Sequence, residues 1–355
     1  MSELRINNIT DRVGSSGPII AGVSTVTSTS HMVMPSGPTE FRGGRGRAIF
    51  NGGYEAPSNS SEIQTVEIAT LGNATNFGNL STARQDGASL ANSIRGISAG
   101  GNPSQQSVIE YIIMSSGGGA NDFGDLTLGR RAFKGAGNDT RGIFFGGNTP
   151  TRQSIIDFIT IATTGDATEF GRIGVNAGND STEGGFGNDD NAACSSPTRA
   201  FVFGSGNMTN VIQFVTISTR GDSQDFGDLT QGNVRFPAGL SSNTRGVSGG
   251  GRQPSPLNQV NIIQSFEMAT LGNSTNFGDL SQSRELLASA SSRTRGLFAG
   301  GYIPSPAVTY NVIDSITIAS ASNATDFGDL TYSGQTNGAS RTFSGCSDVN
   351  GGIGD

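Results

Sequence analysis

The side chains best suited to catalysis or metal binding are few in this sequence and lie far apart along it. Its 355 residues include one histidine, His31, one lysine, Lys134, and two cysteines, Cys194 and Cys346. A catalytic triad or a histidine-bearing metal centre needs a histidine beside its other members. His31 stands in a polar N-terminal segment, so we expect it at a surface or an interface. The sequence therefore predicts a non-enzymatic protein with no cofactor and no metal.

Carboxylates are numerous, and a glycosidase needs only two of them, about 5 to 9.5 Å apart. Seven of the 29 Asp and Glu residues, however, recur at two fixed positions of a repeat, and a catalytic group has no reason to appear once per repeat. One set follows Phe-Gly, and another set, which includes glutamines, opens the β-branched segments: Asp125, Asp228, Asp279 and Asp329; Gln64, Glu110, Asp157, Gln213, Gln264 and Asp314. We expect both sets to cap turns or to pair with the arginines of the repeat. A glycan-processing propeller enzyme is the alternative.

The repeat is most regular around its phenylalanine. The phrases are NATNFGNL, GANDFGDL, DATEFGRI, DSQDFGDL, NSTNFGDL and NATDFGDL, with phenylalanines spaced 46, 47, 56, 51 and 50 residues apart. A period near 50 is typical of a four-stranded propeller blade. Each unit also contains a small-residue strand, an arginine-led strand ending in Gly-Gly, a variable loop and a β-branched strand. The sequence thus predicts an all-β fold of stacked units closed into a ring.

The ends of the repeat region predict how this ring closes. The first arginine-led strand, from Arg47, has no small-residue strand before it, whereas the chain ends on such a strand, RTFSGCSDVNGG, from Arg341. The C-terminal strand is therefore expected to complete the first blade. This gives a six-bladed β-propeller over residues 41–355, with residues 1–40 outside it as an N-terminal arm. A seven-bladed ring, the alternative, would require GVSTVTSTSHMVM of the arm to join the sheet.

Two residue types of the repeat have predicted structural roles. Because strands near a propeller axis are crowded, Gly-Gly lets backbones approach, and the arginine before it can reach carbonyls and carboxylates of neighbouring loops. Cys194 and Cys346 occupy the same strand position in well-separated repeats, so their Cα atoms cannot come within the roughly 4.4 to 6.8 Å that a disulfide needs. Both are predicted to be free, buried thiols.

Charge and hydropathy argue against nucleic acid and membranes as partners. The formal net charge is -7, no basic stripe is present, and phosphate binding needs clustered positive charge. No run of 18 apolar residues occurs, and the N-terminal MSELRINNITDRVGSSGPII lacks the apolar core of a signal peptide. We therefore expect a protein made in a cytoplasm and not inserted in a membrane.

Function on a repeat scaffold is expected where the repeat is broken. An insertion lengthens the interval from Phe170 to Arg199 to 29 residues, against 18 from Phe123 to Arg141. Calcium binding, a partner contact and a merely tolerated insertion are the alternatives for its four carboxylates, with a partner contact as the functional prediction: Asp180, Glu183, Asp189 and Asp190.

The loops after each Gly-Gly leave the same end of every blade and so form one surface. Aromatic faces with polar neighbours suit contact with a glycan or a protein, although tyrosines can also pack their own loops. Five residues of these loops are the candidate binding residues: Tyr54, Arg152, Arg252, Tyr302 and Tyr310.

The order of segments in each unit resembles the kelch repeat, with phenylalanine where kelch blades usually carry tryptophan. The arm and phrases such as IDFITIATTGDATEFG are also similar to virion proteins of tailed phages that infect marine cyanobacteria. That resemblance implies a structural or tail-fibre-associated protein of the virion. The arm would then anchor the propeller to other virion proteins, with copies of the chain assembling as a homo-oligomer, for which a trimer is one form. The propeller would serve host attachment through a surface glycan or protein.

Overall fold

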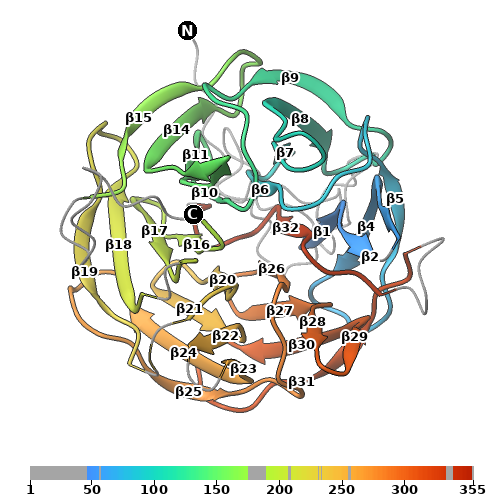
Figure 1. Ribbon diagram of the computed structural model, residues 1–355, viewed down its shortest axis with the longest axis vertical. Coiled ribbons are helices and arrows are strands. Elements are labelled where there is room, and N and C mark those ends of the chain that lie inside the picture. The colour runs from blue at the N-terminus through green and yellow to red at the C-terminus, as the bar shows by residue number, and fades with distance from the viewer. Residues whose placement is uncertain are drawn as a thin grey trace, which may run out of the picture. The chain divides into compact units, whose positions relative to one another are not determined.

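The computed structural model describes residues 46–55, 57–174, 189–206, 209–230, 232, 234–254, 257–332 and 339–353. Six four-stranded antiparallel sheets stand around a central axis as the blades of a propeller (Figure 1), which confirms the predicted all-β, six-bladed fold. Among these residues no helix is long and apolar enough to cross a membrane. The predicted arm, with His31, and the insertion residues Asp180 and Glu183 lie outside the described residues, so the domain boundary near residue 40 stays a prediction.

The strands of each blade follow the segments of the repeat, from the axis outwards. The innermost strands are the small-residue segments β6 (Ala88–Ala91), β10 (Lys134–Gly137), β16 (Ala192–Ser195), β20 (Ala238–Ser241), β26 (Ala288–Ser291) and β32 (Ser344–Ser347). The second strands are the arginine-led segments β1 (Arg47–Asn51), β7 (Arg95–Ala99), β11 (Arg141–Phe145), β17 (Arg199–Phe203), β21 (Arg245–Gly249) and β27 (Arg295–Ala299).

The outer half of each blade comes from the β-branched segment and the phenylalanine phrase. The third strands are β4 (Glu62–Glu67), β8 (Val108–Ile113), β14 (Ile155–Thr160), β18 (Val211–Thr216), β24 (Ile262–Glu267) and β30 (Val312–Thr317). The outermost strands are β5 (Thr75–Asn79), β9 (Asn121–Asp125), β15 (Thr168–Arg172), β19 (Gln224–Asp228), β25 (Thr275–Asp279) and β31 (Thr325–Asp329).

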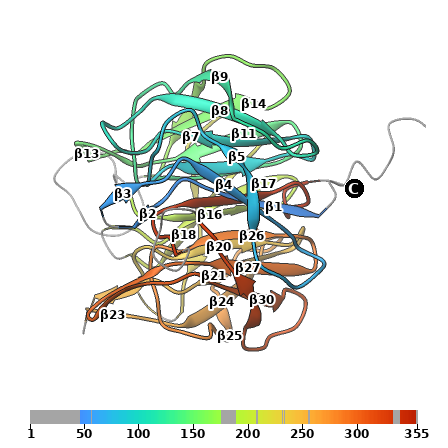
Figure 2. The same cartoon turned by 90° about the vertical axis from the view of Figure 1, so that its right-hand side faces the viewer.

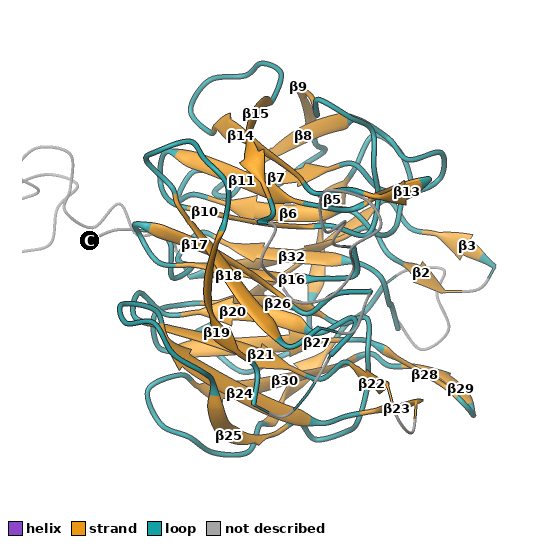
Figure 3. Cartoon of the chain, turned by 60° about the vertical axis from the view of Figure 1, so that its left-hand side comes forward, coloured by secondary structure: helices purple, strands orange, loops and turns teal. Residues whose placement is uncertain are grey.

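Short hairpins extend four of the loops between second and third strands. They are β2 (Tyr54–Glu55) with β3 (Ser58–Asn59), β12 (Asn148–Thr149) with β13 (Thr151–Arg152), β22 (Arg252–Pro254) with β23 (Leu257–Gln259), and β28 (Tyr302–Pro304) with β29 (Ala307–Thr309). Figures 2 and 3 show these hairpins on one side of the propeller, which we call the hairpin face.

The two ends of the repeat region meet in one sheet, in the order β32, β1, β4, β5. The C-terminal strand β32 pairs antiparallel with β1, and Ala48 lies opposite Ser347 while Asn51 lies opposite Ser344. Figure 1 shows this pairing near the axis, where the red end of the chain lies beside its blue beginning. The predicted closure by the C-terminal strand is confirmed.

The hydrophobic cores lie between neighbouring blades, because each sheet must cover its apolar face with the next one. Phe226 of β19 shows the arrangement, since its ring centroid lies 5.1 Å from that of Phe201 in its own blade and 5.5 Å from that of Phe266 in the next. The other repeat phenylalanines are buried in the same way, except for the half-buried Phe77. Phenylalanine therefore fills the inter-blade position without needing a polar partner.

Six arginines link each blade to the next around the whole ring. The Nη1 of each arginine that begins a second strand donates to a main-chain carbonyl just after the third strand of the following blade, over 2.6 to 3.0 Å. The pairs are Arg47 to Met114, Arg95 to Ile161, Arg141 to Ile217, Arg199 to Met268, Arg245 to Ile318 and Arg295 to Ile68. This confirms the predicted reach of the arginines to neighbouring carbonyls.

The Gly-Gly pairs permit the close approach that the sequence predicted. Gly100 has a φ of +58°, and a Cβ added to it would lie 2.7 Å from the carbonyl oxygen of Arg130 in the next blade. The N–H of Gly101 donates to that same oxygen over 2.9 Å. A side chain at Gly100 would therefore collide with the neighbouring backbone in a conformation that already disfavours it.

Three blades contain a fully buried ion pair between the arginine before the innermost strand and an acid of the third strand. The pairs are Arg84 with Glu110 at 2.5 Å, Arg130 with Asp157 at 2.7 Å, and Arg284 with Asp314 at 2.9 Å. We number the blades 1 to 6 by their second strands, β1, β7, β11, β17, β21 and β27. Blades 1 and 5 carry Ser340 and Val234 at the arginine position and glutamines, Gln64 and Gln264, at the acid position. Each of these five blades therefore carries either both charges or neither charge at these two positions. The predicted pairing of the acids with repeat arginines is confirmed for the three blades that carry both.

Both cysteines are free and buried, at the same position of β16 and β32, as predicted. Burial raises the pKa of the Cys194 and Cys346 thiols well above their usual range. Such thiols stay protonated and act as small apolar side chains of the innermost strands.

Candidate functional site

A closed ring of main-chain hydrogen bonds surrounds the axis where the innermost strands begin. One residue per blade, with φ between 55° and 62°, donates its N–H to the carbonyl of the equivalent residue in the preceding blade, over 2.7 to 3.4 Å. We call these the ring residues: Asp86, Ala132, Asp190, Phe236, Leu286 and Thr342. They fix the mouth of the propeller because each one is bonded to both of its neighbours.

The residue before each ring residue joins the mouth to the hairpin face. Five of these pre-ring residues form a main-chain bridge or hydrogen bond with the residue that follows a Gly-Gly pair: Gln85 with Asn102, Arg131 with Asn148, Arg235 with Arg252, Glu285 with Tyr302, and Arg341 with Tyr54. The sixth, Asp189, accepts the N–H of Gly206 through its main-chain oxygen. Side chains of the ring, the pre-ring positions and the hairpins are therefore neighbours on one face.

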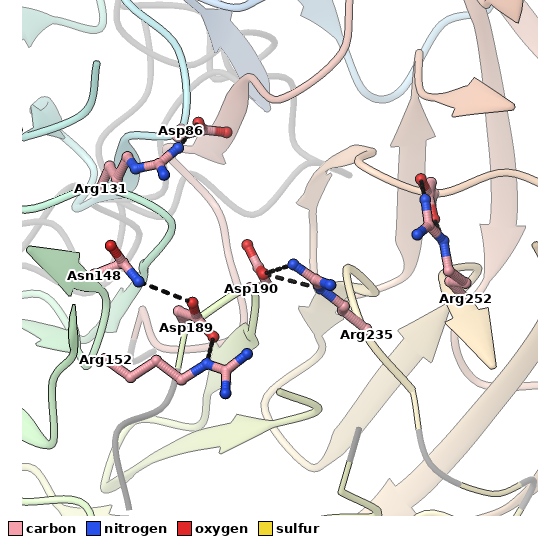
Figure 4. A network of polar contacts seen from close by, with 9 residues as sticks. Asp86, Arg131, Asn148, Arg152, Asp189, Asp190, Arg235 and Arg252 are labelled. Atoms are coloured by element: carbon pink, nitrogen blue, oxygen red, sulfur yellow. Dashed lines mark hydrogen bonds and ion pairs between the residues drawn. The ribbon is translucent and has the colours of Figure 1, made fainter. Parts of the chain in front are cut away.

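Most charges on this face are paired with one another (Figure 4). Arg131 lies 3.6 Å from Asp86, and Arg235 lies 2.7 Å from Asp190. The predicted binding residue Arg152 lies 2.7 Å from Asp189, whose other carboxylate oxygen accepts from Asn148.

Arg252, another predicted binding residue, forms an ion pair with Glu285. The structure thus brings Arg152 of the loop surface together with Asp189 of the insertion, two residues that the sequence assigned to separate sites. It leaves Arg152 and Arg252 each held by a carboxylate of the protein.

Burial controls the protonation of the groups around the mouth. Burial, strengthened by the neighbouring Asp189, raises the pKa of the Asp190 carboxyl to about 6, although Arg235 opposes the change. Burial also raises the pKa of Asp86 and lowers the pKa of the Lys134 ammonium, which Asp86 and Asp190 partly offset. The mouth is therefore a set of buried, mutually dependent charges.

The predicted tyrosines divide into two places. Tyr54 and Tyr302 both flank the guanidinium of Arg341, whose Cζ lies 5.2 Å from the ring centroid of Tyr54 and 3.7 Å from that of Tyr302. Tyr310 instead lies near Arg284, whose pKa is lowered by burial, an effect that Asp314 and, to a smaller extent, Tyr310 oppose. Sequence reasoning missed Arg341 as a site residue, although aligning SRTF at residues 340–343 with RRAF at residues 130–133 would have identified its position.

A narrow cavity of about 70 Å³ follows the axis between the innermost strands. Leu90, Lys134, Cys194, Leu240 and Leu287 are among its lining residues. A cavity needs at least roughly 10 to 15 Å³ on this measure to hold an ordered water, and ligand pockets are typically about 300 Å³ or larger, so this cavity suits ordered water and not a sugar ring. A ligand of that size must bind outside the axis.

The end of the axis opposite the ring is closed by hydroxyl groups and by the C-terminal turn. Serines that end the innermost strands donate to a carbonyl of the preceding blade: Ser195 to Gly137, Ser241 to Ser195, Ser291 to Ser241, and Ser347 to Ser291. Blades 2 and 3 carry Ala91 and Gly137 there and lack the hydroxyl.

Asn350 supplies both missing donors. Its Nδ2 donates to the carbonyl of Ala91 over 2.9 Å and to that of Ser347 over 3.0 Å. The residues after β32 therefore complete this circle of hydrogen bonds, and β32 itself completes the sheet.

No group of three or more histidine, cysteine, aspartate or glutamate side chains is placed to hold a metal ion within the described ranges. Asp189 and Asp190 of the insertion contact arginines, as described above. The chain matches no protein-family model, and no curated protein is significantly similar to it in sequence. The described residues form a six-bladed β-propeller with one polar, hairpin-bearing face.

Proposed function

We propose that this chain is a non-enzymatic structural protein of a phage virion, in which a kelch-like propeller is displayed on the particle. Residues 1–40 would anchor it to other virion proteins and join copies of the chain as a homo-oligomer, such as a trimer. The propeller would present its hairpin face outwards, as part of a tail fibre, appendage or decoration, to a host surface glycan or to another virion protein.

One observation supports this proposal most: the loops that differ between blades come together on a single face. The hairpins contribute tyrosines and arginines there, while the backbone beneath them is fixed by the ring of six main-chain bonds. A rigid base with variable, aromatic and polar loops is typical of a binding surface. The carboxylates of Asp189 and Glu285 form ion pairs with arginines, and an ion-paired carboxylate is better suited to a structural or binding role than to proton transfer.

One group favours the alternative, a glycan-processing enzyme. Asp190, whose pKa is raised to about 6, resembles a general acid in its environment. Its Oδ2 accepts two hydrogen bonds from Arg235, over 3.0 and 2.7 Å, which leaves the other carboxylate oxygen for a second partner.

The two functions are separated by incubating the purified protein with surface polysaccharide from host cells. Saturable binding without release of new reducing ends is the expected result. Release of reducing ends that disappears in Asp190→Asn would favour the enzyme and contradict the proposal.

A further inference from the structure

Arginines occupy three of the six pre-ring positions, and two of them meet a carboxylate at the ring position of the preceding blade. Arg131 faces Asp86, at 3.6 Å, and Arg235 faces Asp190, at 2.7 Å. Arg341 has the same place in blade 1, but the ring residue of its preceding blade is Leu286. The carboxylate that the fold supplies to the other two arginines is thus replaced by a hydrocarbon side chain.

The surroundings of Arg341 supply aromatic rings instead of an acid. Its guanidinium lies over the face of Tyr302, at 3.7 Å, with Tyr54 at 5.2 Å. Within the described part of the chain, no ion pair or side-chain hydrogen bond engages the guanidinium, and the residue is half-buried. Stacking leaves the N–H groups at the edge of the guanidinium plane available to a ligand.

We propose that Arg341, flanked by Tyr54 and Tyr302, binds a carboxylate group of an acidic surface polysaccharide. The planar guanidinium can donate two parallel hydrogen bonds to a carboxylate, as Arg252 does to Glu285, from Nε to Oε2 and from Nη2 to Oε1. Tyrosine rings beside it offer an apolar surface to the body of a sugar, with few rotatable bonds to immobilise. This inference rests on the proposed glycan-contacting function and names the chemical class of the ligand.

The substitution Leu286→Asp tests the inference without removing any residue of the site. It would place a carboxylate where Asp86 and Asp190 stand, and so would occupy Arg341 from within the protein. Leu286 has a φ of +62°, a conformation that aspartate and asparagine tolerate better than most residues, so Leu286→Asn is the uncharged control. Arg131→Gln is a second control, because Arg131 stands at the same position but already faces Asp86.

The probes are methyl β-D-glucuronide and its neutral counterpart methyl β-D-glucoside, titrated against the full chain by NMR. Host surface polysaccharide is tested alongside them with the same variants. We expect the glucuronide to bind, the glucoside to bind at least tenfold more weakly, and Leu286→Asp to weaken glucuronide binding at least tenfold. Leu286→Asn and Arg131→Gln should leave the dissociation constant within about twofold of wild type.

Three results would overturn the inference, and they have different consequences for the proposed function. If the polysaccharide binds wild type and Leu286→Asp equally well, Arg341 is not the binding site, while glycan contact by the propeller stands. If wild type binds neither the glucuronide nor the polysaccharide, the acidic-glycan site and the glycan-contacting function fail together. Binding of glucuronide and glucoside with equal affinity also refutes a carboxylate site, because a sugar-stacking surface alone would give that result.

Discussion

The buried pair of Arg130 and Asp157 should respond to substitution according to charge matching. Both side chains are fully buried, and Nη1 of Arg130 lies 2.7 Å from Oδ2 of Asp157. Replacing Arg130 by valine, the residue that blade 5 carries as Val234, leaves the carboxylate without its cation and with Thr127 as a hydrogen-bond donor. Loss of one partner of a buried pair typically costs about 3 to 5 kcal/mol of unfolding free energy.

Removing the other partner of the pair, by Asp157→Gln, should lower the unfolding free energy further. Nε and Nη2 of Arg130 have no hydrogen-bond partner, and burial already lowers the pKa of this arginine. Without the carboxylate the buried guanidinium would have no counter-charge, and of its present hydrogen bonds only the weak one from Nη1 to the carbonyl of Leu128, at 3.3 Å, would remain. We therefore expect a loss at or above the upper end of that range, about 5 kcal/mol.

The double substitution Arg130→Val with Asp157→Gln reproduces the uncharged pair Val234 and Gln264 of blade 5. Its unfolding free energy should lie within about 2 kcal/mol of the wild-type value, because no charge remains buried without a partner. Urea unfolding followed by circular dichroism measures all three variants, and Glu169→Gln, in the exposed pair with Arg172, is the control expected to change stability by less than about 1 kcal/mol. Losses that simply add in the double variant would refute the reasoning.

Three further predictions concern closure, pH dependence and glycine. Asn350→Ala should lower the unfolding free energy, measured in urea, by about 1 to 3 kcal/mol, because two main-chain carbonyls lose their donor. Deletion of residues 341–355 should prevent folding of the whole ring. A stable deletion variant would contradict closure by the C-terminal strand. Folding raises the pKa of Asp190 from 3.8 to about 6, so its contribution to the free energy of unfolding should fall by up to about 3 kcal/mol as pH rises from 4 to 7. In Asp190→Asn the melting temperature should therefore depend less on pH over that range than in wild type. An unchanged dependence of the melting temperature on pH would disprove the shift. Gly100→Ala should destabilise by more than about 1 kcal/mol, measured by thermal melting, whereas Ala substitution of the open Gly118, whose φ of +109° carries strain alone, should cost less; equal losses would show that the close approach to Arg130 is unimportant.

Local repetition made the fold predictable, because every blade repeats the same four segments. The spacing of the phenylalanines predicted the blades, and the missing strand before Arg47 predicted the partner of β1. The arginines of the second strands were predicted to reach neighbouring carbonyls, and all six do so.

The site was less predictable, because its contacts join residues of different blades. Arg152 and Asp189 were assigned to separate features, and their ion pair depends on how the hairpin of blade 3 meets the start of blade 4. The ring residues carry no glycine signature, since their positive φ falls on residues as different as Phe236 and Leu286. Asn350 lies beyond the repeat, and its role follows from hydroxyl groups that two other blades lack.

In the proposed function, this propeller is displayed on a virus particle. Immunogold electron microscopy of purified particles, with antibody raised against residues 46–353, tests it most directly. We predict gold at one defined location on each particle, and gold at tail or fibre tips would connect the hairpin face to host attachment. Particles that carry no gold, while the protein is abundant in the infected-cell lysate, would contradict the account.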